Sequence, residues 1–140
     1  VFEKKLLRIF AEALKSIKMK FAWIVNSEDG LDEISPYAKT NVVQLKNGHL
    51  SEIEINPLDL NINAEKFENL LGDDSNYNAN KIIEIFKGKD NDFSKAVCLN
   101  AAAGLIVAEK FKKFDEAYND ARKHILSGNA FKHLTNLQNA

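Results

Sequence analysis

A chain of 140 residues has the length of one domain and is long enough to bury a real core. Its composition, 45% hydrophobic and 28% charged, is ordinary for a globular protein. The formal net charge of -1 supplies no basic field for nucleic acid, the longest apolar run (101–108) is too short to span a bilayer, and the single Cys98 excludes an internal disulfide and fits a reducing, cytoplasmic compartment.

The first predicted elements are a helix and a buried strand. Apolar residues recur at helical spacing from Phe2 to Ile17, which is one apolar face of a helix. The continuous apolar run Phe21–Val25 is rich in aromatic and β-branched residues, so it predicts a strand buried on both faces. A helix followed by a buried strand is typical of an α/β sheet with parallel strands, and we expect that fold class.

An acidic stretch leaves the carboxyl end of this strand. Four carboxylates, Glu28, Asp29, Asp32 and Glu33, surround Gly30. Ligands of open α/β sheets bind at the carboxyl ends of strands. Mg²⁺ takes one or two carboxylates from protein, with water and substrate phosphate completing its octahedron. The adjacent Asp32 and Glu33 are therefore the best candidates for a metal site, although spacing alone favours a solvated acidic loop with a turn at Asp29-Gly30.

A β-hairpin follows the acidic stretch. Two strands, 41–46 and 49–55, flank Asn47-Gly48, which is the strongest short-range signal for a type I′ turn. Alternation of Ile and Glu in the second strand predicts one face toward water.

The remainder of the chain is predicted to be helical. The expected helices are Ala64–Leu71, Asn78–Lys87, Phe93–Phe111, Asp115–Leu126 and Ala130–Leu137. Ser75 or Asn76 is the expected cap of the second of these, and Asp115 that of the fourth. The third is apolar nearly all round, so we expect it to be buried, and Asn100 within it must hydrogen-bond a structural partner.

No side chain is predicted to be catalytic. His49 lies at the hairpin tip, and neither His124 nor His133 has a Cys or acidic partner at metal-ligand spacing. Cys98 falls in the buried helix, where a thiol behaves as a small hydrophobe. A Gly-rich phosphate loop is also absent from the sequence.

Read in series, these segments resemble the C-terminal half of anthranilate phosphoribosyltransferases. The resemblance is carried by the turn Asp29-Gly30-Leu31-Asp32-Glu33-Ile34-Ser35, the Asn47-Gly48 hairpin, Asn78–Ile83, the run Val97-Cys98-Leu99-Asn100-Ala101-Ala102-Ala103 and Ala121–Leu134. It covers essentially the whole chain. The acidic turn and the Leu-Asn-Ala-Ala run are specific together, whereas either alone is weak.

The resemblance implies the C-terminal part of an α/β phosphoribosyltransferase domain over residues 1–140, without the N-terminal helical domain and the phosphate-loop half. It implies a Mg²⁺-dependent homodimeric enzyme of tryptophan biosynthesis that joins anthranilate to the ribose of phosphoribosyl pyrophosphate. Carried over residue by residue, Asp32 and Glu33 match the pair that coordinates Mg²⁺ on the pyrophosphate. Because the chain starts at Val1 and its only methionine is Met19, we expect a fragment that is inactive alone. After Ser35, the segment 36–39 departs from the Thr/Gly-rich continuation of many members, so its substrate contacts are not carried over.

Two alternatives stay open at the level of sequence. One is a pyrimidine nucleoside phosphorylase of the same fold, against which the acidic turn and short hairpin argue. The other is a non-catalytic relative that binds nucleic acid, which the near-neutral charge disfavours. Neither a nucleic-acid nor a membrane partner is expected.

Overall fold

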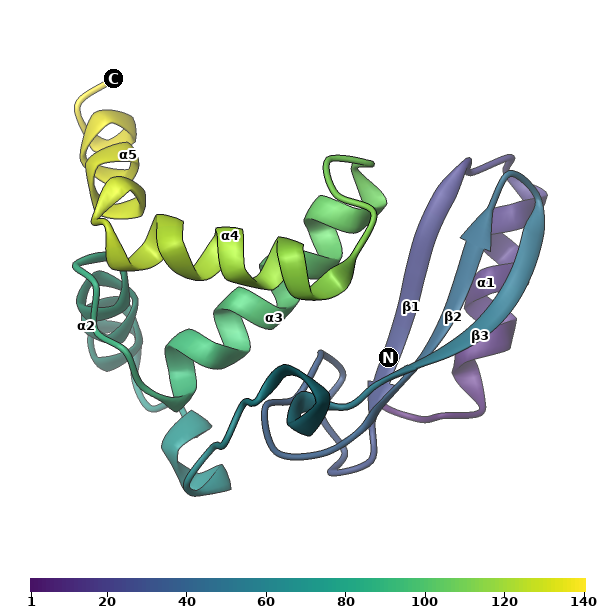
Figure 1. The fold of residues 1–140 in the computed structure, drawn as a ribbon, viewed down its shortest axis with the longest axis horizontal. Coiled ribbons are helices and arrows are strands. Elements are labelled where there is room, and N and C mark those ends of the chain that lie inside the picture. Colours follow the sequence, from purple (N-terminus) through teal and green to yellow (C-terminus); the bar gives the residue numbers. More distant parts are fainter.

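The computed structural model describes all 140 residues, Val1–Ala140, as a small sheet with helices on both faces. The helices are α1 (Leu6–Ser16), α2 (Ser75–Phe86), α3 (Asp92–Val107), α4 (Phe114–Leu126) and α5 (Asn129–Gln138), and the strands are β1 (Phe21–Ser27), β2 (Thr40–Lys46) and β3 (His49–Ile55). Short 3₁₀ turns, Pro57–Leu60 and Phe67–Leu70, lie between β3 and α2. Figure 1 shows α1 on one side of the sheet and the crossed helices α3 and α4 on the other. None of the helices is long and apolar enough to cross a membrane.

Alternate side chains of β1 belong to two separate hydrophobic cores. Trp23 and Val25 pack toward α3 and α4, and the Trp23 ring stacks on Phe114 with centroids 5.9 Å apart. Ile24 faces the other way and joins a smaller cluster with Leu7 and Ala11 of α1. Successive strand side chains point to opposite faces, so a continuous apolar run is what a strand covered on both sides requires. Both faces are packed as predicted, but the strand is less buried than predicted, because within Phe21–Val25 only Ile24 is fully buried.

The pairing of this strand differs from the prediction. The α/β class is confirmed, but β1 pairs antiparallel with β2 along its whole length, from Phe21 opposite Lys46 to Ser27 opposite Thr40. The strand order is β1-β2-β3, which leaves β1 at an edge. A parallel partner would need a crossover connection, usually a helix, whereas residues 28–39 form only an irregular turn between β1 and β2.

The hairpin is confirmed in position and turn type. β2 and β3 pair antiparallel from Thr40 opposite Ile55 to Lys46 opposite His49. Asn47 (φ 50°) and Gly48 (φ 79°) both have positive φ, as a type I′ turn requires. β3 is more exposed than predicted, because Ile55 is its only buried residue.

The helical prediction needs three corrections. Ala64–Leu71 is not a helix, since only Phe67–Leu70 forms a 3₁₀ turn and Lys66 is extended. The cap of α2 is Asp74, whose carboxylate accepts from the Tyr77 N–H at 2.8 Å, rather than Ser75 or Asn76. Asp115 lies inside the first turn of α4 instead of capping it.

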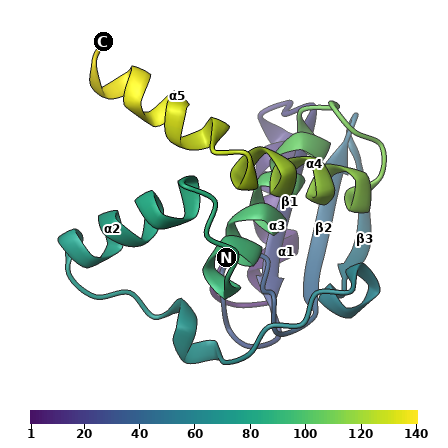
Figure 2. The ribbon, with the colours of Figure 1, turned by 60° about the vertical axis from the view of Figure 1, so that its left-hand side comes forward.

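The helices divide into a buried pair and an outer pair. α3 contributes seven buried residues and α4 four, whereas α2 contributes one and α5 none. The predicted burial of α3 is confirmed, although this helix ends at Val107. Figures 1 and 2 both show α2 and α5 at the end of the molecule far from the sheet. The acidic turn is therefore positioned by the sheet and α3.

Candidate metal-binding turn

The candidate metal-binding turn, called the metal-binding turn below, comprises residues 28–39 and links the last residue of β1 to the first of β2. Its mouth is closed by the Glu28 N–H, which donates to the Lys39 carbonyl at 2.9 Å. The Ser27 N–H donates to the Leu31 carbonyl at 2.9 Å, and the Gly30 N–H donates to the Ser27 carbonyl at 3.1 Å. Gly30 has φ 92°, a conformation that side chains other than glycine rarely adopt. The predicted turn at Asp29-Gly30 is confirmed.

One of the four carboxylates is occupied with holding the turn together. Asp29 accepts from the Leu31 N–H through Oδ1 at 3.3 Å and from the Ser35 hydroxyl through Oδ2. The Ser35 Oγ accepts in turn from the Tyr37 N–H at 3.0 Å, and the Ser35 N–H donates to Thr40 Oγ1 at 3.2 Å. Asp29 is therefore a structural carboxylate rather than a free ligand.

A second attachment joins the turn to α3. Asn100 Oδ1 accepts from the Ile34 N–H at 2.9 Å, and its Nδ2 donates to the Ile34 carbonyl at 3.0 Å and to the Ala96 carbonyl at 2.9 Å. Ile34 is fully buried in the main core. The expectation that Asn100 has a structural hydrogen-bond partner is confirmed, and that partner is the residue directly after Glu33.

The predicted ligands Asp32 and Glu33 are both exposed on this turn. Neither carboxylate is among the ion pairs or side-chain hydrogen bonds of the chain. Partial burial and the nearby charge of Asp32 raise the pKa of Glu33 above its ordinary value. The structure thus places two hard oxygen donors side by side, uncommitted and accessible.

These two carboxylates fit Mg²⁺ only as part of a larger ligand set. Nowhere in the chain do three or more His, Cys, Asp or Glu side chains gather as they would to hold a metal ion by themselves. Mg²⁺ keeps several waters and is bound through one or two carboxylates together with substrate phosphates. The donor set therefore suits a Mg²⁺ ion that arrives with a phosphate, and not a closed structural metal site.

The other candidate residues are brought into no site. His49 is exposed at the hairpin tip. His124 and His133 line one shallow depression, but with Asn129, Lys132 and Asn136 and without a carboxylate or thiol. Burial raises the pKa of the Cys98 thiol to about 11, so this cysteine is inert at neutral pH, as expected for a small core residue.

Sequence reasoning missed a buried carboxylate beside the turn, that of Asp92 at the start of α3. Its partners are the Tyr37 hydroxyl at 3.0 Å, the Glu65 N–H at 2.9 Å, the Asn69 amide at 2.9 Å and the Lys95 ammonium at 2.8 Å. Burial alone would raise the pKa of Asp92, but these hydrogen bonds outweigh it and hold that pKa well below its usual range. Asp92 links Tyr37, near the end of the turn, to the segment that carries Glu65 and Asn69. These residues are far from Asp92 in the sequence, so no local sequence pattern predicts the contacts.

Comparison with known proteins identifies the family. A model described as the glycosyl transferase family, a/b domain, matches residues 1–131. The anthranilate phosphoribosyltransferase of Pelagibacter ubique is 70% identical over 139 residues, which are 99% of this chain and 42% of that protein. That of Azospirillum brasilense is 38% identical over 143 residues, which cover 100% of this chain and 40% of that protein.

Solved structures give the same fold. The anthranilate phosphoribosyltransferase of Thermus thermophilus superposes with a TM-score of 0.87 at 27% identity, over 97% of this chain and 40% of that one. The Saccharomyces cerevisiae enzyme in complex with PRPP and Mg superposes with a TM-score of 0.86 at 24% identity, over 96% of this chain and 39% of that one. The chain spans about two fifths of the length of these relatives. It belongs to the glycosyl transferase family, as part of its a/b domain.

Proposed function

We propose that the protein carrying this chain is an anthranilate phosphoribosyltransferase. It transfers the phosphoribosyl group of phosphoribosyl pyrophosphate to anthranilate and releases pyrophosphate, a step of tryptophan biosynthesis. The observation that supports this most is the 70% identity to the Pelagibacter ubique enzyme across nearly the whole chain. On this proposal residues 1–140 form the C-terminal portion of the a/b domain, and the phosphate loop and helical domain belong to the rest of the protein.

Within that enzyme, Asp32 and Glu33 hold Mg²⁺ on the pyrophosphate. A Mg²⁺ ion held there would supply charge neutralisation for the leaving group. Three features support the assignment: the two carboxylates are adjacent and exposed, they have no competing protein partner, and they lie on a turn fixed to the core through Ile34. Asp29 is left out because it is bound to Ser35.

The proposal extends to the setting of the whole enzyme. We expect a homodimer, because the resemblance implies one, and a cytoplasmic location, because the single buried thiol fits a reducing compartment. The 140-residue chain alone should show no turnover, since half of the phosphate-binding site lies outside it. Transferase activity from the isolated chain would contradict this division of the site.

The metal assignment is tested in the full-length protein with Asp32→Ala combined with Glu33→Ala. We expect kcat/KM for phosphoribosyl pyrophosphate to fall about 100-fold and the Mg²⁺ activation curve to shift to higher concentration, as loss of metal ligands or charge-stabilising groups commonly causes. Glu28→Ala is the matched control, because Glu28 is an exposed carboxylate of the same turn. An unchanged Mg²⁺ dependence in the double variant would remove the site.

A pyrimidine nucleoside phosphorylase of the same fold is the second candidate function. Its assay is phosphate-dependent cleavage of uridine or thymidine by the full-length protein. The relatives reported above, at 70% and 38% identity, favour the anthranilate enzyme. Nucleoside cleavage in the absence of anthranilate transfer would reverse this choice.

A further inference from the structure

The side-chain amide of Asn100, on α3, hydrogen-bonds both backbone groups of Ile34 in the metal-binding turn. The Ile34 N–H and the Ile34 carbonyl each have Asn100 as partner, at 2.9 and 3.0 Å. The remaining Nδ2 hydrogen goes to the Ala96 carbonyl at 2.9 Å, one turn back along the helix. That last bond fixes the amide against its own helix, so the grip on Ile34 has one orientation.

Only an amide of this length satisfies the arrangement. The Ile34 N–H donates to Oδ1 and the Ile34 carbonyl accepts from Nδ2, so a flipped amide would set donor against donor at the N–H and oxygen against oxygen at the carbonyl. A carboxylate keeps the acceptor but repels the Ile34 carbonyl, and an apolar side chain of similar volume leaves both Ile34 groups without a partner. Because Ile34 is fully buried, its backbone groups would then lack water as well as protein partners.

The grip matters for the two carboxylates because Ile34 directly follows Glu33. α3 is packed against β1 and α4, so the Asn100 hydrogen bonds fix the position of the turn relative to the core. Asp32 and Glu33 carry like charges on adjacent residues, and their repulsion favours turn conformations in which they splay apart. Mg²⁺ accepts oxygen ligands only at 2.0–2.1 Å in near-octahedral geometry, so a turn that relaxes binds it less well.

We propose that Asn100 is a positioning residue of the transferase reaction, which holds the turn so that both carboxylates meet one Mg²⁺–pyrophosphate. The inference rests on the proposed function and adds a residue of α3 that touches neither metal nor substrate. A purely structural Asn100 would affect stability alone. A positioning Asn100 also changes the Mg²⁺ requirement of enzyme that is still fully folded.

The test compares Asn100→Asp and Asn100→Leu with Val97→Ala in the full-length enzyme. Val97 lies one turn earlier on α3, packs against the same core and lines a depression with Ala121 and Ile125 of α4, so it controls for loss of helix packing. For each variant we measure the Tm and, well below the Tm, the Mg²⁺ concentration for half-maximal anthranilate transfer at fixed phosphoribosyl pyrophosphate. Asn100→Asp preserves shape and acceptor, so it provides the measurement if Asn100→Leu does not fold.

We expect both Asn100 variants to raise the half-maximal Mg²⁺ concentration about 10-fold, the lower end of the effect of lost outer-shell partners of metal ligands. Val97→Ala should lower the Tm and leave the Mg²⁺ curve in place. If the Asn100 variants lower the Tm and the Mg²⁺ curve does not move, the positioning role is wrong. That result differs from failure of the metal assignment, in which Asp32→Ala with Glu33→Ala leaves the Mg²⁺ response intact. It also differs from failure of the proposed function, in which the unsubstituted full-length protein shows no anthranilate transfer.

Discussion

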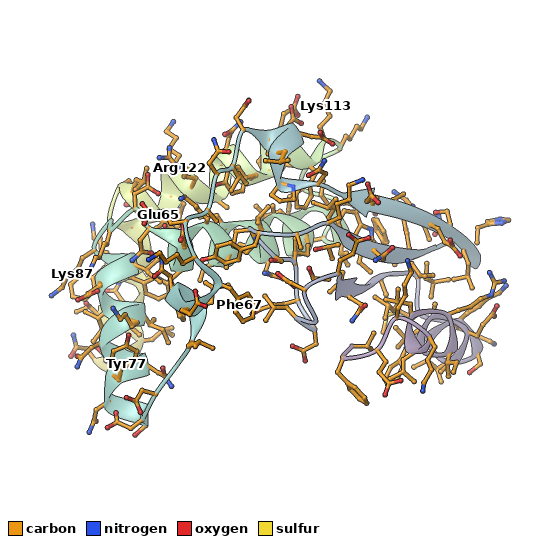
Figure 3. The ribbon with its side chains drawn as sticks, turned by 90° about the horizontal axis from the view of Figure 1, so that it is seen from below. Glu65, Phe67, Tyr77, Lys87, Lys113 and Arg122 are labelled. Atoms are coloured by element: carbon orange, nitrogen blue, oxygen red, sulfur yellow. The ribbon has the colours of Figure 1, made fainter.

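Two irregular segments of this chain are held in different ways. Within the metal-binding turn, Glu28 binds Lys39 and Ser35 binds Asp29, and the turn is attached to its surroundings through Ser35 to Thr40, Ile34 to Asn100 and Tyr37 to Asp92. The connecting segment, residues 61–74, runs from the sheet half toward α2 and carries Glu65 and Phe67, which Figure 3 labels with Tyr77 of α2. Three of its groups, the Glu65 and Lys66 N–H groups and the Asn69 amide, share the single acceptor Asp92. Its other attachments are the Lys66 carbonyl to the Tyr37 hydroxyl, the Asn63 carbonyl to Lys95, and Ile62 in the main core.

The difference concerns how the two segments would respond to a single lost side chain. A turn with redundant ties keeps its shape when one is removed, because the others still satisfy most of the backbone. A segment in which three groups share one buried carboxylate loses the Glu65, Lys66 and Asn69 contacts together when that carboxylate is removed. Redundancy suits a turn that presents two like-charged carboxylates, whereas the shared acceptor makes residues 65–69 the part of the connecting segment that one substitution releases most easily.

The largest expected effect comes from Asp92→Ala. Removal of the carboxylate leaves the Glu65 N–H and the Asn69 amide without their acceptor and Lys95 without its ion-pair partner, so we expect a loss of roughly 3 kcal/mol in the free energy of unfolding. The Tyr37 hydroxyl keeps the Lys66 carbonyl, and the Lys95 ammonium keeps the Asn63 carbonyl. Urea denaturation measures the loss. Hydrogen exchange should show faster exchange at the Glu65 and Lys66 amides and little change at the Ile34 amide.

Asp90→Ala is the control for this experiment. Asp90 lies two residues away and pairs with Arg122, but both side chains are 43% exposed. A surface pair of this kind contributes about 0–1 kcal/mol. Equal losses for Asp90→Ala and Asp92→Ala would mean that the buried carboxylate does not hold the connecting segment.

A smaller effect is expected when only the charge of Asp92 is removed, by acid. Its pKa in the folded protein is held below the unfolded value of about 3.9, so its contribution is complete above that pH and is lost as the pH falls toward the folded pKa. The free energy of unfolding of the wild type should exceed that of Asp92→Asn by a constant amount from pH 6 to pH 8. The excess should shrink below about pH 4. Other carboxylates titrate in both proteins and cancel, so an excess that grows toward low pH would contradict the depressed pKa.

Features set by residues close together in the sequence could be predicted, and features set by residues far apart in the sequence could not. The Asn47-Gly48 hairpin was predictable because two adjacent residues fix its turn type. The place of Asp32 and Glu33 at the end of a strand followed from the apolar run before them. The burial of Asn100 predicts that it has a hydrogen-bond partner, but that partner, Ile34, is 66 positions away and no local sequence pattern identifies it.

The failed helix at 64–71 shows the same limit from the other side. Its composition allows a helix, yet the Glu65 and Lys66 N–H groups donate to Asp92, more than 20 positions later, and Lys66 is extended. A tertiary acceptor has replaced the local one, which intrinsic helix propensity cannot anticipate. The antiparallel pairing of β1 could not be predicted either, because the apolar composition of a strand does not determine whether its neighbour runs parallel or antiparallel.

The smallest expected effect comes from Ser35→Ala, which removes one tie of the metal-binding turn. The Asp29 carboxylate and the Tyr37 N–H each lose a partner, but the Asn100 grip on Ile34 and the closure of Glu28 on Lys39 remain. We expect a loss of about 1 kcal/mol in the free energy of unfolding, well below that of Asp92→Ala, and an unchanged Mg²⁺ half-maximum in the full-length enzyme. Chemical denaturation and the Mg²⁺ activation curve measure the two quantities. A loss as large as that of Asp92→Ala would show that the turn depends on one tie after all, and the contrast between the two segments would then reduce to a difference in which residue carries the tie.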